Sequence, residues 1–158
     1  MLVWRRRYDE ALAELHRAVE LDINYAQGHA LLGMALMYAG QSAEALESLA
    51  TSMRLDPHYP NIVLHLMAQA HFSLGHDEIA ASHLLERIAR NPNTDASRML
   101  LAAAFGHLGR LDEARAAWAG LREVNPNFSL AQREGVLPYK DRADFQRIID
   151  GLAKAGLP

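Results

Sequence analysis

The sequence of 158 residues contains no cysteine, which excludes disulfide bonds, thiolate zinc sites and cysteine nucleophiles. Aromatic residues are scarce at 7%, although half of the residues are hydrophobic, which is sufficient for a folded core. The chain also lacks a basic excess, because its formal charge is −3, whereas a nucleic-acid-binding domain is usually basic. These features indicate one folded domain that is not a dedicated nucleic-acid binder.

Long hydrophobic runs are absent as well. The longest uncharged apolar run, residues 30–39, is shorter than the ~20 residues that a membrane-spanning helix needs. At the N-terminus the apolar residues 1–4 precede the arginines 5–7, whereas a signal peptide has its positive charges first. We therefore expect a cytoplasmic protein without membrane contact, and we interpret the three arginines as a solvated helix end.

Three residue types recur along the chain with a period of 34 or 35 residues. The alanines are Ala11, Ala45, Ala80 and Ala114, the glycines are Gly40, Gly75 and Gly109, and the prolines are Pro57, Pro92 and Pro126. Such self-similarity is typical of stacked repeats, in which no unit buries its apolar face alone. Within a unit, apolar residues recur at helical spacing. Glycines suit helix ends and prolines follow helices, so each unit is predicted to be a pair of antiparallel helices.

This pattern resembles the tetratricopeptide repeat (TPR), whose motif is W-x2-L-G-x2-Y, followed by G, A-x3-F and P. Residues 26–60 match best, and the family's positions are taken there in order by Leu32, Gly33, Leu36, Gly40, Ala45, Leu49 and Pro57. The resemblance implies an all-α, right-handed solenoid over residues 1–128. The expected units are a half repeat at 1–25 and full repeats at 26–60, 61–94 and 95–128.

After Pro126 the period stops, and residues 129–158 are predicted to form a helical cap in which Asp141 begins a helix. Residues 138–141 and 149–158 are similar to the extreme C-terminus of bacterial class III adenylate cyclases with a C-terminal repeat region. The similarity implies that the chain is the regulatory C-terminal segment of a larger bacterial signalling protein. It assigns no catalytic residue, because the cyclase domain would precede Met1.

In the TPR family, the first helix of each unit lines a concave face that binds extended or helical peptides. The resemblance places on that face Ala30, Met34, Met37, Tyr38, His65, Gln69, Phe72, Met99, Ala103 and His107. The set is apolar and rich in methionine, which suits an adaptable surface, so we expect a protein partner that offers an apolar or amphipathic peptide or helix. It lacks the lysine, asparagine and arginine clamp with which some family members bind acidic chaperone tails. The alternative is that the methionines pack inside the solenoid.

The N-terminal half repeat has a second helix at about residues 8–21 but only a short stub before it. Its apolar face is a candidate for self-association, and the expected contacts of such a homodimer are Trp4, Leu12 and Leu15. Alternatively, the stub folds back and covers this face, and the sequence favours neither arrangement.

The sequence shows no motif for catalysis, a cofactor or a metal. The histidines include no pair at helical zinc spacing, since those closest in sequence on the central units are His65, His71, His76 and His83. There is no phosphate-binding glycine loop and no nucleophile elbow. Acidic pairs at the helix starts are explained by the helix dipole. We therefore expect an interaction scaffold and not an enzyme.

Overall fold

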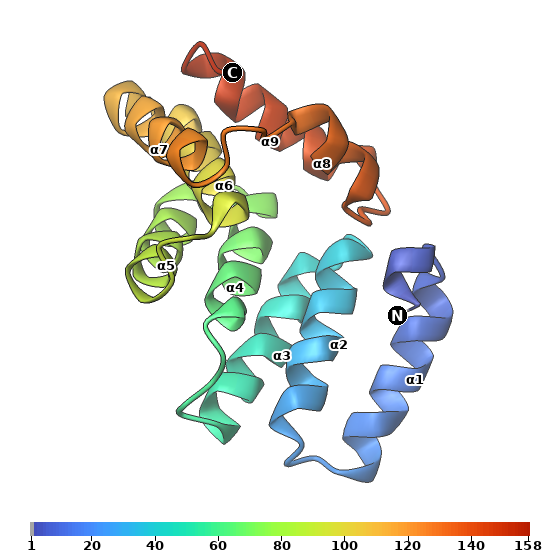
Figure 1. The fold of residues 1–158 in the computed structure, drawn as a ribbon. Helices are drawn as coiled ribbons and strands as arrows, with labels where there is room; N and C mark the ends of the chain where they lie inside the picture. Colours follow the sequence, from blue (N-terminus) through green and yellow to red (C-terminus); the bar gives the residue numbers. More distant parts are fainter. Residues whose placement is uncertain (1) are drawn as a thin grey trace.

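The computed structural model describes residues 2–158, and all regular structure in this range is helical (Figure 1). The elements in chain order are the 3-10 helix η1 (Val3–Arg5) and the α-helices α1 (Tyr8–Leu21), α2 (Ala26–Tyr38), α3 (Ser42–Leu55), α4 (Ile62–Ser73), α5 (Asp77–Arg90), α6 (Asp95–His107), α7 (Leu111–Val124), α8 (Leu130–Val136) and α9 (Arg142–Lys154). This arrangement confirms the predicted all-α fold.

The repeats form a stack of helix pairs that follows the order of the chain. Helix α2 packs on α3, α4 on α5 and α6 on α7, and contacts of α3 with α4 and of α5 with α6 join neighbouring pairs. Helix α1 packs on α2 at the N-terminal end. Figure 1 shows that the stack curves, so that its inner side is lined by the first helix of each pair.

Small residues let the helices approach closely. A β-carbon on Gly33 of α2 would lie 2.5 Å from Cγ of Leu49 on α3, so a larger residue would push the pair apart. Fully buried alanines recur along the stack at Ala45, Ala68, Ala80, Ala102 and Ala114. The core is therefore a series of close helix–helix contacts, which explains how a chain with few aromatic residues buries its apolar surface.

The periodic glycines end the first helix of each pair, as predicted. Gly40 has a φ of +85°, a conformation that costs residues with a β-carbon free energy. The N–H of Gln41 then donates to the carbonyl of Leu36 at 2.9 Å, which satisfies an otherwise unpaired helix-end carbonyl. Gly75 and Gly109 repeat the positive φ at the next two turns.

The N-terminal stub folds back, which is one of the two arrangements that the sequence left open. Arg6 has a left-handed φ of 57°, and its N–H donates to the carbonyl of Val3 at 2.9 Å. Val3 is fully buried, and the Trp4 ring lies edge-on to the Tyr38 ring with centroids 5.5 Å apart. The stub therefore covers part of the end of the stack, although Trp4 itself remains 47% exposed.

The turn between α8 and α9 brings Pro138 back to Tyr8 at the N-terminal end of the stack, whereas α9 then runs away from that end, toward α6 and α7 (Figure 1). Asp141 begins α9 as predicted, since its carboxylate accepts a 2.8 Å hydrogen bond from the N–H of Ala143. Helix α9 packs on α6, and the two backbones meet so closely that a β-carbon on Gly106 would overlap the carbonyl of Gly151. None of the helices in residues 2–158 has the length and apolar character needed to cross a bilayer.

Candidate functional site

The predicted groove residues lie on α2, α4 and α6, but most of them are shielded from solvent. The buried members of the set are Met37, Tyr38, Gln69, Phe72, Met99 and Ala103. The half-buried members are Ala30, Met34, His65 and His107. Only part of the set is therefore accessible to a partner in this structure, and Met37 and Met99 pack internally, which is the alternative that the sequence left open.

The chain's own residues 137–141, which we call the tail segment, cover part of the predicted groove. Tyr139 is 6% exposed, and its ring lies edge-on to the Tyr38 ring with centroids 5.1 Å apart. The side-chain amide of Gln69 donates to the Tyr139 hydroxyl, and the backbone N–H of Lys140 donates to the carbonyl of Tyr38 at 2.8 Å. The inner faces of α2 and α4 therefore already bind an extended piece of polypeptide.

The N-terminal elements hold the same segment from the other side. The Tyr8 hydroxyl donates to the carbonyl of Pro138 at 2.9 Å, and Arg6 donates to the carbonyl of Tyr139 at 3.3 Å. Burial raises the pKa of the Tyr139 hydroxyl, which therefore stays protonated at neutral pH. The tail segment thus links the half repeat to the central repeats, a contact that the sequence did not predict.

Helix α9 fills the groove farther along, beside α4 and α6. The Arg147 guanidinium lies 4.3 Å from the centroid of the Phe72 ring and donates two hydrogen bonds of 2.8 Å to Asp77. The ring nitrogen Nε2 of His107 lies 2.8 Å from the carbonyl oxygen of Arg147. Phe72 and His107 are therefore on the predicted face, but they contact the chain's own last helix.

One apolar part of the face stays open, between α2 and α4. This open groove has a volume of about 390 Å³, and its lining includes the polar residues Gln27, Ser52 and Asp56. Its apolar side chains are Ala26, Ala30, Leu31, Met34, Pro60, Ile62, Val63 and Leu66. Ile62 is 45% exposed. Ala30 and Met34 belong to the predicted set, whereas Ile62 and Leu66 were missed. The helical spacing of Ile62 and Leu66, four residues apart on α4, is the signal that could have identified them.

A buried polar chain connects α5, α6 and α4. Arg87 donates to Ser97 Oγ at 3.0 Å, and Ser97 Oγ lies 2.9 Å from Nδ1 of His65. Because Ser97 accepts from Arg87, its own proton is free to be donated to a neutral His65 ring. Burial, with a smaller contribution from the Arg87 charge, lowers the pKa of His65 to about 3. These hydrogen bonds hold the half-buried His65 ring in place in its neutral form, which suits a structural role.

Three histidines meet at the surface near the turn between α4 and α5. Nδ1 of His71 lies 3.2 Å from Nδ1 of His76, and the His71 ring stacks on His83 with centroids 5.8 Å apart. Sequence spacing did not predict this cluster, because the turn and the helix pairing bring the rings together. Within residues 2–158, no group of three or more histidine and carboxylate side chains has an arrangement that could hold a metal ion.

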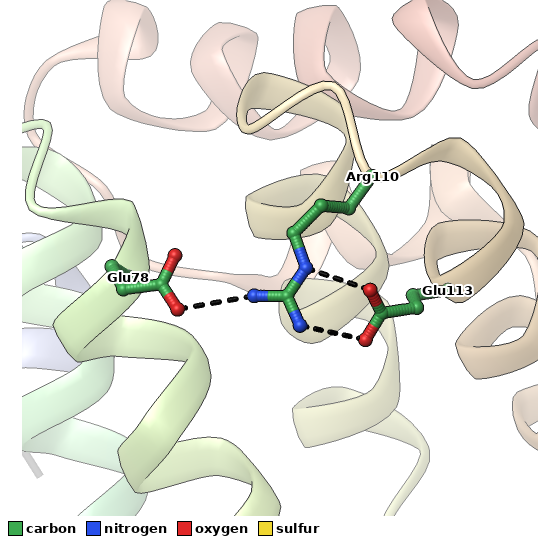
Figure 2. A network of polar contacts seen from close by, with 3 residues as sticks. All are labelled: Glu78, Arg110 and Glu113. Carbon is green, nitrogen blue, oxygen red and sulfur yellow. Dashed lines mark hydrogen bonds and ion pairs between the residues drawn. The ribbon is translucent and has the colours of Figure 1, made fainter.

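Charged side chains on the outer surface are largely paired with one another. Figure 2 shows Arg110 between Glu78 of α5 and Glu113 of α7, at 3.0 and 2.7 Å. A hollow of about 400 Å³ beside the tail segment carries both signs of charge, and Arg142 there pairs with Glu134 at 3.1 Å. Exposed pairs of this kind are screened by solvent, so we assign no binding site to them.

Comparisons with known proteins relate this fold to one family. A family model described as tetratricopeptide repeat matches residues 36–103. No curated protein matches the sequence. Among solved structures, MamA aligns with a TM-score of 0.72 at 21% identity, over 94% of this chain and 86% of that chain.

Two further solved structures have the same fold. YrrB, described as a TPR protein with an unusual peptide-binding site, aligns with a TM-score of 0.66 at 20% identity, over 94% of this chain and 76% of that chain. The first TPR of Spaghetti (RPAP3), bound to an HSP90 peptide, aligns with a TM-score of 0.62 at 24% identity, over 81% of this chain and 93% of that chain. The chain therefore has the fold of a TPR solenoid, and its central residues 36–103 match the tetratricopeptide repeat family.

Proposed function

We propose that the chain is a protein-interaction module whose open groove between α2 and α4 binds an apolar or amphipathic peptide of a partner protein. The observation that carries this proposal is the groove itself, with its volume of about 390 Å³ and its mostly apolar lining. Pockets of this size and character are typical ligand sites. Burying the remaining exposed 45% of Ile62 contributes about 1 kcal/mol.

A short amphipathic helix suits this groove best. Its walls are α2 and α4, with Ser52 and Asp56 from the end of α3 also in the lining. Grooves between helices accept apolar anchors spaced at three and four residues. Met34 can adjust its side chain to anchors of different shape. The similar fold of YrrB, a TPR protein described as having a peptide-binding site, supports a peptide as the ligand.

The proposal is tested with a double substitution in the open groove. Peptides are first selected from a displayed library against the full chain, and their affinities are then measured by fluorescence anisotropy. We expect Met34→Glu with Ile62→Glu to weaken the selected peptides by about tenfold or more, because both anchors would face a charge. Leu85→Glu is the matched control, since Leu85 is 50% exposed on α5. Equal affinity for the double variant and the wild type would contradict the proposal.

The choice of positions matters for this experiment. Met37 and Phe72, which the repeat pattern also suggests, are fully buried. Charged residues at these two positions would disrupt the core, so a loss of binding there would report unfolding.

Self-association through the N-terminal end is a second candidate, supported by its exposed apolar residues. Leu21 and Ile23 are 79% and 73% exposed, and Trp4 is 47% exposed. Leu12 and Leu15 are half-buried on α1. A homodimer that buries this end would sediment as a dimer, and Trp4→Glu would return it to the monomer. A wild-type chain that stays monomeric at high concentration would exclude this candidate.

For the wider context, we propose a cytoplasmic bacterial signalling protein of the cyclase-like kind, in which this chain is a regulatory segment without catalysis of its own. Support comes only from the similarity of residues 138–141 and 149–158 to the cyclase tail. The sequence encoded upstream of Met1 is the test. A nucleotide-cyclase domain there supports the proposal, and a domain of another class contradicts it.

A further inference from the structure

Backbone hydrogen bonds are one part of what holds the tail segment in place. It lies between the end of α8 and the start of α9, and both Leu137 (φ −68°, ψ 130°) and Asp141 (φ −97°, ψ 123°) are extended. The body of the protein binds the carbonyls of Pro138 and Tyr139 and the N–H of Lys140. Every peptide has these backbone groups, so the same donors and acceptor can hold an extended segment of another chain.

Two side chains of the segment add selectivity. Pro138 is fully buried, and Tyr139 inserts between Tyr38 and Phe145, whose ring centroids lie 5.1 and 6.1 Å from its own. The Tyr139 hydroxyl receives a hydrogen bond from Gln69. A phenylalanine would leave this buried amide donor without a partner, which typically costs about 1–3 kcal/mol. The site therefore favours tyrosine after proline.

Gln69 also indicates that the tail segment does not satisfy the site completely. The residue is only 3% exposed, and no donor within residues 2–158 makes a hydrogen bond with its Oε1. Next to it lies a small enclosed space of about 20 Å³, which Gln69, Tyr139 and Arg133 help to line. A segment that placed a donor there would gain a hydrogen bond that the chain's own residues do not provide.

We propose that Arg6, Tyr8, Tyr38 and Gln69 form a recognition site for an extended partner peptide in which tyrosine follows proline, and that the chain's own tail segment occupies this site as a tethered competitor. The site is separate from the open groove, because none of these four residues lines that groove. The inference therefore goes beyond the proposed function and adds a second, self-blocked site to the same inner face.

Tethering explains how the site is kept closed. The segment is fixed on one side by α9, through Arg147 and Asp77, and on the other by α8, whose Arg133 pairs with Asp95 at 2.6 Å. A ligand held by short linkers has an effective concentration of roughly the millimolar range. A free peptide with the same contacts consequently competes poorly unless the tethered tyrosine is removed.

The experiment uses the full chain and a fluorescein-labelled peptide with the sequence of residues 136–142. Binding is measured by fluorescence anisotropy to the wild type and to the Tyr139→Ala chain, after circular dichroism has shown that the variant is folded. We expect the variant to bind at least about tenfold more tightly than the wild type, because its tail segment has lost the Tyr139 ring and hydroxyl and therefore competes less well for the site. The same peptide carrying Tyr139→Ala is the control ligand, and its affinity for the variant should be at least about tenfold lower.

A conservative variant covers the case in which Tyr139→Ala fails to fold. Tyr139→Phe keeps the ring but loses the hydroxyl that Gln69 binds, so the peptide should bind it more tightly than the wild type. Equal affinity for wild type and variant, or no binding to a folded variant, overturns the proposal. A wild-type dimer that sediments as a monomer in Tyr139→Ala, but not in Trp4→Glu, also overturns it, because the two copies would then exchange tail segments.

The two sites can be tested apart from each other. In the Tyr139→Ala chain, adding Met34→Glu and Ile62→Glu should leave binding of the 136–142 peptide unchanged, whereas it should weaken peptides selected for the open groove. Loss of the 136–142 peptide in this combined variant would contradict a separate site.

Discussion

Arg147 of α9 and Asp77 at the start of α5 form a two-pronged ion pair, in which both terminal nitrogens of the guanidinium donate to the carboxylate at 2.8 Å. The side chains are only 25% and 11% exposed. The same guanidinium covers the Phe72 ring. One residue of the last helix therefore fixes that helix to the middle of the stack, in a geometry that is stronger than that of an ordinary surface pair.

Arg147→Met should destabilise the protein by about 1–2 kcal/mol, because it keeps the aliphatic stem but leaves the shielded Asp77 carboxylate unpaired. The measurement is urea unfolding followed by circular dichroism. Arg142→Met on the same helix is the matched control, since Arg142 is 82% exposed in its pair with Glu134. The control should change stability by less than about 0.5 kcal/mol. Similar effects of the two substitutions would show that the Arg147 pair has no special role.

Gly106→Ala should displace α9 from α6. A β-carbon at this position would overlap the carbonyl of Gly151, and neither backbone can move without loss of packing. We expect a loss of about 2 kcal/mol or more and a lower melting temperature. Gly135→Ala in α8 is the control, because a β-carbon there meets open space. That control should leave stability unchanged or raise it by up to about 1 kcal/mol. A Gly106→Ala protein as stable as the wild type would refute the close contact.

Acidification should weaken the fold through His65. Its pKa is lowered from the ordinary 6.5 to about 3 in the folded chain, so below pH 6.5 the unfolded chain binds a proton that the folded chain does not. The stabilising contribution of His65 to the free energy of unfolding is complete above pH 6.5 and falls as the pH drops toward 3. Between pH 7 and pH 5 the loss is about 1–2 kcal/mol. His65→Gln should remove most of this loss in denaturant titrations at the two pH values. His16→Gln, at an exposed position on α1, should retain it. An unchanged pH dependence in His65→Gln would exclude His65 as its source.

The periodic part of the structure could be predicted from the sequence, because each repeat is defined by local chemistry. Gly40 and Gly75 end helices by a backbone conformation, and Asp141 begins one through a side-chain hydrogen bond. The positions of Met34 and Phe72 in the repeat motif also predicted that both lie on the first helices of their units. These features depend on residues only a few positions apart.

The occupant of the inner face could not be predicted in this way. Tyr139 lies after the period has stopped, and its partners Gln69 and Arg6 are 70 and 133 residues away in sequence. No local pattern encodes such contacts, so residues assigned to a partner are instead covered by the chain itself. The histidine cluster escaped prediction for the same reason, since His71 and His83 are on different helices.

The backbone amide of Lys140 provides the most direct test of the central claim, which is that the chain's own tail segment occupies the inner face. Its N–H donates to the carbonyl of Tyr38 at 2.8 Å, although it belongs to neither α8 nor α9. Hydrogen exchange followed residue by residue should show Lys140 strongly protected in the wild type and exposed in the Tyr139→Ala chain. Exchange of the wild-type Lys140 amide at the rate of an unstructured peptide would contradict the account.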